Sequence, residues 1–285
     1  MVLLRRLPRW LFFGGIVLYI ALPMIAVVLY SFSGRWTQHV LPDVYTLDHW
    51  REGLTEHRLR WVLFRTTWLA LVVLVLDILL VVPAVYWQRV RNPRIRVITE
   101  LMAAIPFVLP FIVIAYGVLD LVGVYRPQLL GTWYLLALCH SAIAFPFLYW
   151  AIDGAMSAAN VGRLNEAAQM CGAGPVQTLR LVVLPNIGPG LATGGMLVFA
   201  TSFGEFALAQ ILVGARFENV SLYSLNLLRE TTSQFGKLAV LTVITFTLLF
   251  VISVAVVYFN RGVVVRALPG GRTVGAVGAA GGERG

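Results

Sequence analysis

Three ionisable side chains interrupt long apolar stretches of this sequence, at Asp77, His140 and Glu205. An ionisable group in the hydrocarbon core of a membrane costs about 2.5–3.5 kcal/mol on insertion scales, so such a residue normally has a function or a partner. Asp77 could neutralise a cationic solute, or it could be a buried structural acid. His140 is expected to hydrogen-bond a neighbouring helix rather than to bind a ligand. Asp77 and Glu205 could also carry protons or ions.

Glu205 ends the segment Ser202-Phe203-Gly204-Glu205, which has the S-x-x-E spacing of a helix capping box. Gly204 weakens a helix locally because glycine loses more backbone freedom on folding than other residues do. Two structures satisfy this pattern. One is a break that opens backbone groups to a solute or a gate, and the other is a continuous helix whose Glu205 bonds a neighbouring helix. The candidate residues of a solute pathway are therefore Asp77, Glu205, Ser202, Phe203 and His140.

A second candidate site is the polar stretch NEAAQMCGAGPVQTLRLVVLP, residues 165–185, which lies between two apolar runs. Gly172 predicts the end of a first helix because glycine adopts the left-handed conformation at little cost. Pro175 suits the first turn of a second helix, and Pro185 is expected to end it. The apolar stripes of the two helices are predicted at Leu164, Ala167, Ala168 and Cys171, and at Val176, Leu179 and Val183.

The first of these helices has features of a docking element. Glu166 stands beside Ala167 and Ala168, whose small side chains allow another surface to approach closely. A short helix of this kind suits a groove on a partner protein. The alternative is an amphipathic helix resting on lipid headgroups, but such helices favour basic and aromatic residues that this one lacks. The composition favours a protein partner.

The elements around these residues are apolar. The chain has 285 residues, of which 59% are hydrophobic and 12% charged, whereas soluble domains carry about 25% charged residues. A helix needs about 20 apolar residues to cross a bilayer. Apolar runs of that order occur at about 10–31, 62–87, 97–122, 133–152, 189–213 and 238–259.

Basic residues set the expected orientation. They occur at the N-terminus, between the second and third runs, and after the sixth run, which the positive-inside rule places in the cytoplasm. The net charge of +9 is explained by these membrane ends, so no nucleic-acid partner is expected. The first run is longer than the roughly 7–15 apolar residues of a signal peptide, so it is predicted to remain as a span.

The predicted fold is an all-α integral membrane protein with six transmembrane helices and both termini in the cytoplasm. Residues 1–9 form a cytoplasmic N-terminus, and residues 10–260 form the membrane domain. The polar helix pair lies in a cytoplasmic loop, 153–188, between helices 4 and 5. Residues 261–285 are expected to be a disordered cytoplasmic tail because they are rich in Gly, Ala and Val with scattered Arg.

Two further features bear on this scheme. Pro106 and Pro110 predict a bend in the third run, because proline removes a backbone hydrogen bond and kinks a helix. Cys139 and Cys171 have neither a CxxC pattern nor a histidine at ligand spacing, so no metal site is expected.

The helix pair carries a motif. Glu166-Ala167-Ala168, three residues, Gly172, nine residues, Val182, one residue and Leu184-Pro185 resemble the EAA signature of ABC importer permeases, EAA-x3-G-x9-I-x-L-P. Only Val182 departs from it, replacing Ile. The resemblance covers roughly residues 10–260 and is to binding-protein-dependent, type I permeases of the bacterial plasma (inner) membrane. The Ser-Phe-Gly-Glu-Phe segment is loosely similar to permeases of the polyamine, ferric-iron, sulfate/molybdate and phosphonate branch.

The resemblance implies that the helix pair couples the membrane domain to a cytosolic ATPase. Glu166 would anchor near the ATPase and Gly172 would set the bend between the helices. ATP and Mg²⁺ would be bound by that partner, so this chain is expected to hold no cofactor and to be no enzyme itself. In agreement, the sequence has no G-x-x-x-x-G-K-[ST] loop. The coupling residues would be Glu166, Ala167, Ala168, Gly172, Val182, Leu184 and Pro185.

The other implied partners are a second, non-identical permease, an extracytoplasmic substrate-binding protein and membrane lipid. Polyamines are the favoured cargo if Asp77 is a counter-ion. The alternative function is an ion-coupled secondary transporter that uses Asp77 and Glu205 and needs no ATPase. An intramembrane enzyme would need converging catalytic groups, which the sequence does not present as a motif.

Overall fold

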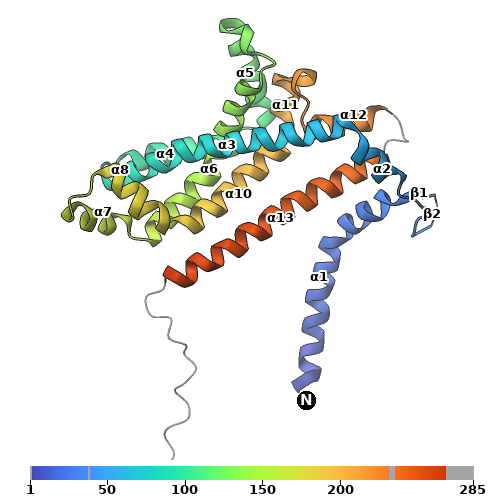
Figure 1. Cartoon of the computed structure of the whole chain (residues 1–285), viewed down its shortest axis with the longest axis horizontal. Helices are drawn as coiled ribbons and strands as arrows, with labels where there is room; N and C mark the ends of the chain where they lie inside the picture. Colours follow the sequence, from blue (N-terminus) through green and yellow to red (C-terminus); the bar gives the residue numbers. More distant parts are fainter. Residues whose placement is uncertain (1, 38, 231–234, 268–285) are drawn as a thin grey trace, which may run out of the picture. The chain divides into compact units, whose positions relative to one another are not determined.

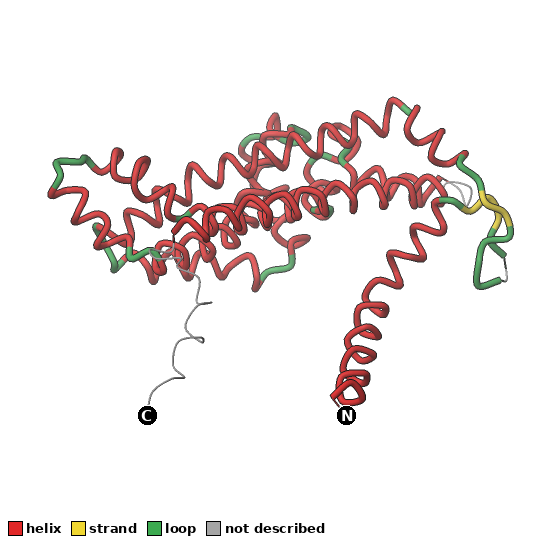
Figure 2. Tube along the Cα trace, turned by 60° about the horizontal axis from the view of Figure 1, so that its bottom comes forward, coloured by secondary structure: helices red, strands yellow, loops and turns green. Residues whose placement is uncertain are grey.

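A computed structural model describes residues 2–37, 39–230 and 235–267, nearly all of them helical (Figures 1 and 2). The chain divides into two units. Unit 1 comprises Met1–Leu76, Ala104–Ala144 and Val198–Ile252, and unit 2 comprises Asp77–Ala103, Phe145–Leu197 and Ser253–Gly285.

The elements follow in the order α1 Val2–Ser31, β1 Ser33–Arg35, β2 Val44–Tyr45, α2 Asp48–Thr55, α3 His57–Val90, α4 Ile95–Val108, α5 Phe111–Tyr125, η1 Pro127–Leu129, α6 Trp133–Ala158, α7 Val161–Met170, α8 Pro175–Thr178, the π-helical η2 Leu179–Val183, α9 Leu184–Asn186, α10 Gly188–Gly204, α11 Ala207–Leu212, η3 Gly214–Phe217, α12 Val220–Glu230 and α13 Phe235–Ala267.

Four of the described helices are long and apolar enough to cross a membrane, at Trp10–Ser31, His57–Val90, Trp133–Ala158 and Phe235–Tyr258. Two further pairs qualify together but are bent. Ile95–Val108 with Phe111–Tyr125 turns by 103°, and Pro175–Asn186 with Gly188–Gly204 turns by 81°. The described chain thus has between 4 and 6 candidate spans, which is consistent with the predicted helical membrane fold.

The bend predicted from the two prolines is present. Pro106 lies inside α4, and Pro110 precedes the first residue of α5 with φ −58° and ψ 136°. Proline at 110 supplies no N–H to continue the α4 ladder, and it disfavours helical geometry at the residue before it. The apolar run therefore turns at this point instead of continuing as one rod.

The predicted fifth apolar run, 189–213, is not one helix. It is interrupted after Gly204, where α10 ends, and helical structure resumes at Ala207 in the short α11. The side chain of α11 residue Leu208 is fully buried.

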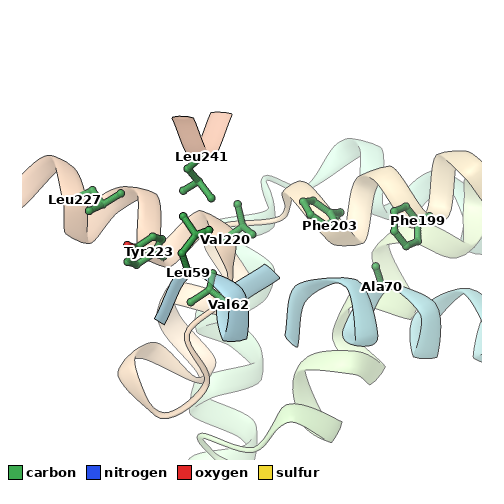
Figure 3. Close-up of a cluster of buried hydrophobic side chains, with 9 residues drawn as sticks. All are labelled: Leu59, Val62, Ala70, Phe199, Phe203, Val220, Tyr223, Leu227 and Leu241. Carbon is green, nitrogen blue, oxygen red and sulfur yellow. The ribbon is translucent and has the colours of Figure 1, made fainter. Parts of the chain in front are cut away.

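In unit 1, α3, α10, α12 and α13 meet in a cluster of buried apolar side chains (Figure 3). Because lipid tails are as apolar as these side chains, the cluster stabilises the fold by close packing rather than by escape from water. Phe203, a predicted pathway residue, is 1% exposed and belongs to this cluster. The members are Leu59, Val62, Ala70, Phe199, Phe203, Val220, Tyr223, Leu227 and Leu241.

The two ends of the chain differ from this packed region. In α1 none of the most apolar window within Trp10–Ser31 is buried by the described chain, so lipid or another protein must cover it. A two-stranded antiparallel pairing of β1 with β2 follows, with Ser33 opposite Tyr45 (Figure 2). At the other end, α13 continues to Ala267, past the predicted start of the tail at residue 261. The rest of that predicted tail lies outside the described residues.

Candidate functional site

The polar stretch forms the predicted helix–turn–helix, residues 161–186, which we call the hairpin. Its first helix is α7, and its second arm is α8, η2 and α9 in succession. The turn closes through hydrogen bonds from Gly172 N to Gln169 O (2.9 Å) and from Ala173 N to Ala168 O (3.0 Å). Gly172 has φ +80°, and no atom lies within 4 Å of the position that a Cβ would take. The glycine is therefore needed for backbone conformation and not for space.

The hairpin presents most of the predicted coupling residues on its surface. Glu166, Ala167, Gly172 and Pro185 are exposed, and Ala168, Val182 and Leu184 are half-buried. Three large apolar side chains accompany them, since Met170 is 90% exposed, Val176 is 76% exposed and Leu181 is 64% exposed. Exposed apolar side chains beside small residues are typical of a surface that another protein covers.

The predicted apolar stripes are only partly correct. In α7 the buried residues are Val161 and Asn165, whereas Ala167 and Cys171 of the predicted stripe are exposed. In the second arm Val183 is buried as predicted, but Val176 is exposed and Thr178 is buried in its place. The buried face of each arm thus contains a polar residue as well as a valine. Hydrophobic periodicity alone does not identify such a face.

Asn165 is the residue that the sequence interpretation placed on another face. Its Oδ1 accepts a hydrogen bond of 2.7 Å from the hydroxyl of Tyr86 on α3. Both residues belong to unit 2, and both are buried, with Asn165 5% and Tyr86 6% exposed. Buried amides require such partners, because an unpaired polar group away from water is costly. The hydrogen bond fixes the middle of α7 to the last turns of α3.

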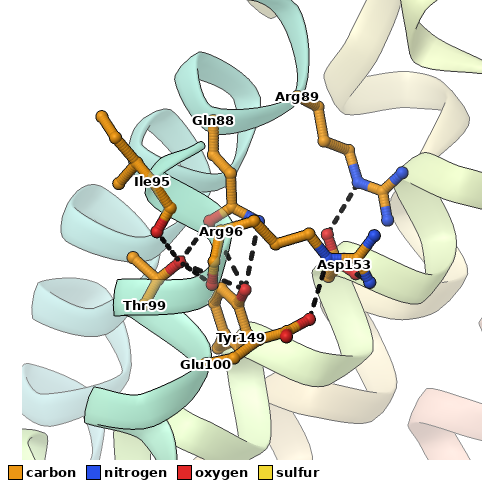
Figure 4. Close-up of polar contacts among 8 residues, drawn as sticks. All are labelled: Gln88, Arg89, Ile95, Arg96, Thr99, Glu100, Tyr149 and Asp153. Carbon is orange, nitrogen blue, oxygen red and sulfur yellow. Dashed lines mark hydrogen bonds and ion pairs between the residues drawn. The ribbon is translucent and has the colours of Figure 1, made fainter. Parts of the chain in front are cut away.

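Beside this contact, a polar cluster joins α3, α4 and α6 (Figure 4). Asp153 accepts a 2.7 Å bond from Arg89 Nε and a 3.4 Å bond from Arg96 Nη2. We call these three residues the clamp. Arg96 Nε also donates to Glu100 Oε1 at 2.8 Å, and Gln88 Nε2 donates to the Tyr149 hydroxyl at 3.1 Å. Arginine suits these contacts because its planar group donates in two directions at once.

A cavity of about 410 Å³ lies between the clamp and the hairpin, within unit 2. Its lining includes Arg89, Arg96, Asn160, Arg163 and Glu166. Asn160 joins α6 to α7 in the left-handed conformation, with φ 50°. The basic connection between α3 and α4 and the acidic residue of the hairpin therefore border the same cavity.

Most of the predicted pathway residues belong to unit 1. His140 Nδ1 lies 2.9 Å from Ser202 Oγ, and His140 Nε2 lies 3.3 Å from Glu205 Oε2. The Glu205 carboxylate also accepts hydrogen bonds from the backbone N–H of Leu208 (3.0 Å) and Ala209 (3.2 Å). Glu205 thus caps α11, while Ser202 lies inside α10 and caps no helix. The break and the interhelical contact, given above as alternatives, occur together.

The backbone carbonyl of Glu205, at this break, has a hydrogen-bond partner that sequence reasoning missed. Asn219 Nδ2 donates to Glu205 O (3.3 Å), and Asn219 Oδ1 caps α12 by accepting from Leu222 N (2.9 Å). We call His140, Ser202, Glu205 and Asn219 the Glu205 network. All four are buried. Asn219 precedes a helix and is an ordinary N-cap type, which is the signal that could have identified it.

Asp77, in the middle of α3, is fully buried and belongs to unit 2. The structure therefore assigns the predicted pathway residues to three settings. Phe203 lies in the apolar cluster, His140, Ser202 and Glu205 lie in the Glu205 network, and Asp77 lies in the other unit.

Comparison with known proteins decides the family. The pattern of the binding-protein-dependent transport system inner membrane component matches residues 78–265, which include the hairpin and the Glu205 network. The chain belongs to this family. It is thus a permease component of a binding-protein-dependent ABC importer, as the resemblance of the hairpin motif indicated.

Individual relatives agree with this assignment. A putative ABC transporter permease protein, ORF1, from Streptomyces antibioticus is 30% identical over 61% of this permease and 74% of its own length. The molybdenum transport system permease protein ModB of Mycobacterium tuberculosis is 27% identical, over 74% and 78% of the two chains. The spermidine/putrescine transport system permease protein PotC of Escherichia coli K12 is 26% identical, over 77% and 82%.

Solved structures agree on the fold. A bacterial ABC transporter involved in the import of the acidic polysaccharide alginate matches with a TM-score of 0.68, at 17% identity, over 89% of the permease and 95% of that chain. The MetNI methionine ABC transporter in an inward-facing conformation matches with a TM-score of 0.57, at 20% identity, over 73% and 99%. The family assignment favours an ABC importer over the alternative of an ion-coupled secondary transporter.

Proposed function

We propose that this permease forms part of the translocation pathway of an ATP-driven importer and couples it to a cytosolic ATPase through the hairpin. The observation that carries the proposal is the arrangement of α7. One face of the helix is fixed within the membrane domain by Asn165, and the other presents Glu166 and Ala167 to the surroundings. An element that is held on one side and bare on the other can transmit movement from a partner.

The predicted orientation fits this role. Arg89, Arg96 and Glu166 border one cavity in unit 2, so the basic connection between α3 and α4 and the hairpin lie at the same membrane surface. The positive-inside rule assigns that surface to the cytoplasm. We count each bent helix pair as one span, which gives six spans with both termini cytoplasmic.

The proposed contact with the ATPase uses the exposed face of the hairpin. Glu166 would accept hydrogen bonds from basic or amide donors of the ATPase, while Ala167 and Ala168 allow close approach. Gly172, Val182, Leu184 and Pro185 would shape the turn and the second arm. ATP and Mg²⁺ would be held by the ATPase, and this chain would contribute no catalytic group.

The remaining proposed partners are suggested by the apolar surface that the described chain leaves unburied and by the family of the permease. A second, non-identical permease or lipid would cover α1, whose apolar window the described chain leaves unburied. A substrate-binding protein would dock on the extracytoplasmic side. The complex would reside in a bacterial inner membrane.

The substrate class is the most specific part of the proposed function. We propose polyamines, with Asp77 as the acid that favours a cationic solute. The relatives named for spermidine/putrescine and for molybdenum transport are similar to this chain at nearly equal identity. The acid at position 77 therefore carries the choice, and uptake of spermidine by the Asp77→Asn variant tests it. Unchanged uptake kinetics would remove Asp77 from the pathway.

The coupling role is tested with Glu166→Ala and Gly172→Val in the complete importer, reconstituted in proteoliposomes with its ATPase and binding protein. Both changes should abolish ATP-dependent uptake while the permease remains inserted. Gly172→Val acts through the backbone, because a β-branched residue is strained at φ +80°. Gln169→Ala on the same exposed helix is the matched control and should transport normally. Normal uptake by the Glu166 and Gly172 variants would contradict the coupling role.

A further inference from the structure

We propose that the Tyr86–Asn165 hydrogen bond is the positioning link through which the hairpin moves α3. The inference rests on the proposed coupling function and adds to it the residues that receive the movement. Neither residue belongs to the hairpin motif, since Asn165 precedes Glu166 and Tyr86 lies on another helix.

Asn165 lies on the inner face of α7. Asn165 and Glu166 are neighbours in sequence and therefore point in directions about 100° apart around the helix. Glu166 is exposed, whereas Asn165 is buried one turn after the buried Val161. A force applied to the outer face of α7 is therefore transmitted to the inner face at Asn165.

The Tyr86–Asn165 hydrogen bond is the polar connection of the hairpin to α3 among the described residues. Other side-chain hydrogen bonds found for the hairpin in the described part of the chain are local. Thr178 Oγ1 donates to Gly174 O (3.0 Å), and Asn186 Nδ2 donates to Val182 O (2.7 Å). The Tyr86–Asn165 contact is short, at 2.7 Å, and is sheltered from water. A hydrogen bond in such surroundings keeps a defined direction better than an apolar contact, which can slide.

The end of α3 that carries Tyr86 is itself joined to α6, and through Asp153 to α4. Arg89, three residues after Tyr86, is held to Asp153 of α6, and Asp153 also holds Arg96 of α4. A pull on Tyr86 therefore acts on a helix end that the clamp has joined to its two neighbours (Figure 4). The clamp converts movement of one residue into movement of three helix ends.

The chain provides matched variants. Tyr86→Phe and Asn165→Leu each remove one partner of the link with little change of shape. Tyr149→Phe is the control for burial, because Tyr149 is 3% exposed and its hydroxyl bonds Gln88 rather than the hairpin. Asn186→Ala is the control for loss of an amide on the hairpin.

The measurement is amide hydrogen exchange of the full permease in nanodiscs, with its ATPase, before and after addition of a non-hydrolysable ATP analogue with Mg²⁺. It needs no knowledge of the cargo. In the natural sequence, nucleotide should change exchange in both the hairpin and the last turns of α3. In Tyr86→Phe and Asn165→Leu the change in the hairpin should persist and the change in α3 should be lost. Both controls should keep both changes. A merely structural role would raise exchange with and without nucleotide alike and would leave the nucleotide-dependent difference in place.

The outcomes separate the link from the coupling role. If the hairpin of the natural sequence is not protected by the ATPase, the proposed function fails. If the hairpin is protected but α3 does not respond, or if Tyr86→Phe keeps the α3 response, the link is overturned while the coupling role stands.

Discussion

The hairpin and the Glu205 network are both polar regions of an apolar chain, and each contains a glutamate close to a glycine. Their polar groups face opposite ways. Glu166 is exposed on the outer face of α7, whereas the carboxylate of Glu205 is buried against His140 and the N–H groups that begin α11. In the first case the acid is free to meet another protein. In the second it replaces the backbone partners that a broken helix lacks.

This difference shows why the presence of an acid in an apolar sequence does not by itself reveal a transport role. A buried acid can serve the fold, and an exposed one can serve an assembly. The contrast between the two glutamates can be tested by ranking variants by how far each lowers the free energy of unfolding.

The largest loss of stability is expected for Glu205→Ala. The change removes the acceptor for the N–H groups of Leu208 and Ala209 and leaves His140 without its carboxylate. Leaving a buried donor without its acceptor costs about 1–3 kcal/mol for each group, and more than one N–H group loses its acceptor here. Thermal unfolding of the purified permease in detergent should show a large fall in the transition temperature. Glu205→Gln keeps an acceptor oxygen and should lose less. An unchanged transition in the Ala variant would show that the network does not hold the break.

A smaller loss is expected for Asp153→Asn, which weakens the clamp. Its bonds to Arg89 and Arg96 are charge-assisted but partly reached by solvent. Hydrogen bonds to charged groups contribute about 1.5–3 kcal/mol, so the same unfolding assay should detect an intermediate shift. Glu100→Gln is the control, because the Arg96–Glu100 pair is about half exposed on both sides and should contribute little. Equal shifts for the two variants would contradict the special role of Asp153.

A pH-dependent effect is expected at Glu218, outside the candidate spans. Burial alone would raise the pKa of this carboxyl, but hydrogen bonds from Arg58 and Asn226 outweigh it and lower the pKa. The stabilisation is therefore present above the ordinary glutamate pKa of about 4.3 and is lost as the pH falls through the lower pKa of the folded state. Unfolding measured from pH 6 downward should show this loss, and Glu218→Gln should flatten the curve. A curve of the same shape in both proteins would exclude the pair as its source.

The smallest effect on stability is expected for Glu166→Ala. The side chain is exposed, and substitutions at such positions usually change stability by less than about 0.5 kcal/mol. Co-purification of the ATPase should nevertheless be lost. A large fall in the unfolding temperature, with the ATPase still bound, would reverse the proposed contrast between the two glutamates.

The sequence was a good guide wherever a local backbone rule applied. Gly172 marked the turn and Pro110 marked the bend, because each acts on its own backbone whatever surrounds it. It was a poor guide to which side of α7 is buried. Asn165 faces inward because of Tyr86, which is 79 positions away, and no local pattern contains that information.

The Glu205 network shows a related limit. The spacing of Ser202 and Glu205 suggested a capping box, yet Glu205 caps the following helix and Ser202 bonds His140 from inside α10. In an apolar chain, faces that meet lipid and faces that meet protein have similar compositions. Periodicity therefore predicts the helices better than their contacts.

The conformation of Gly172 has a stereochemical consequence. Its φ of +80° lies in the region that D-amino acids favour, and no atom lies within 4 Å of the position that the Cβ of an L-amino acid would take. Position 172 is therefore restricted by the backbone conformation that a residue must adopt there and not by the size of its side chain. Among natural residues asparagine should be the mildest replacement, as Asn160 already adopts a left-handed conformation immediately before the same hairpin.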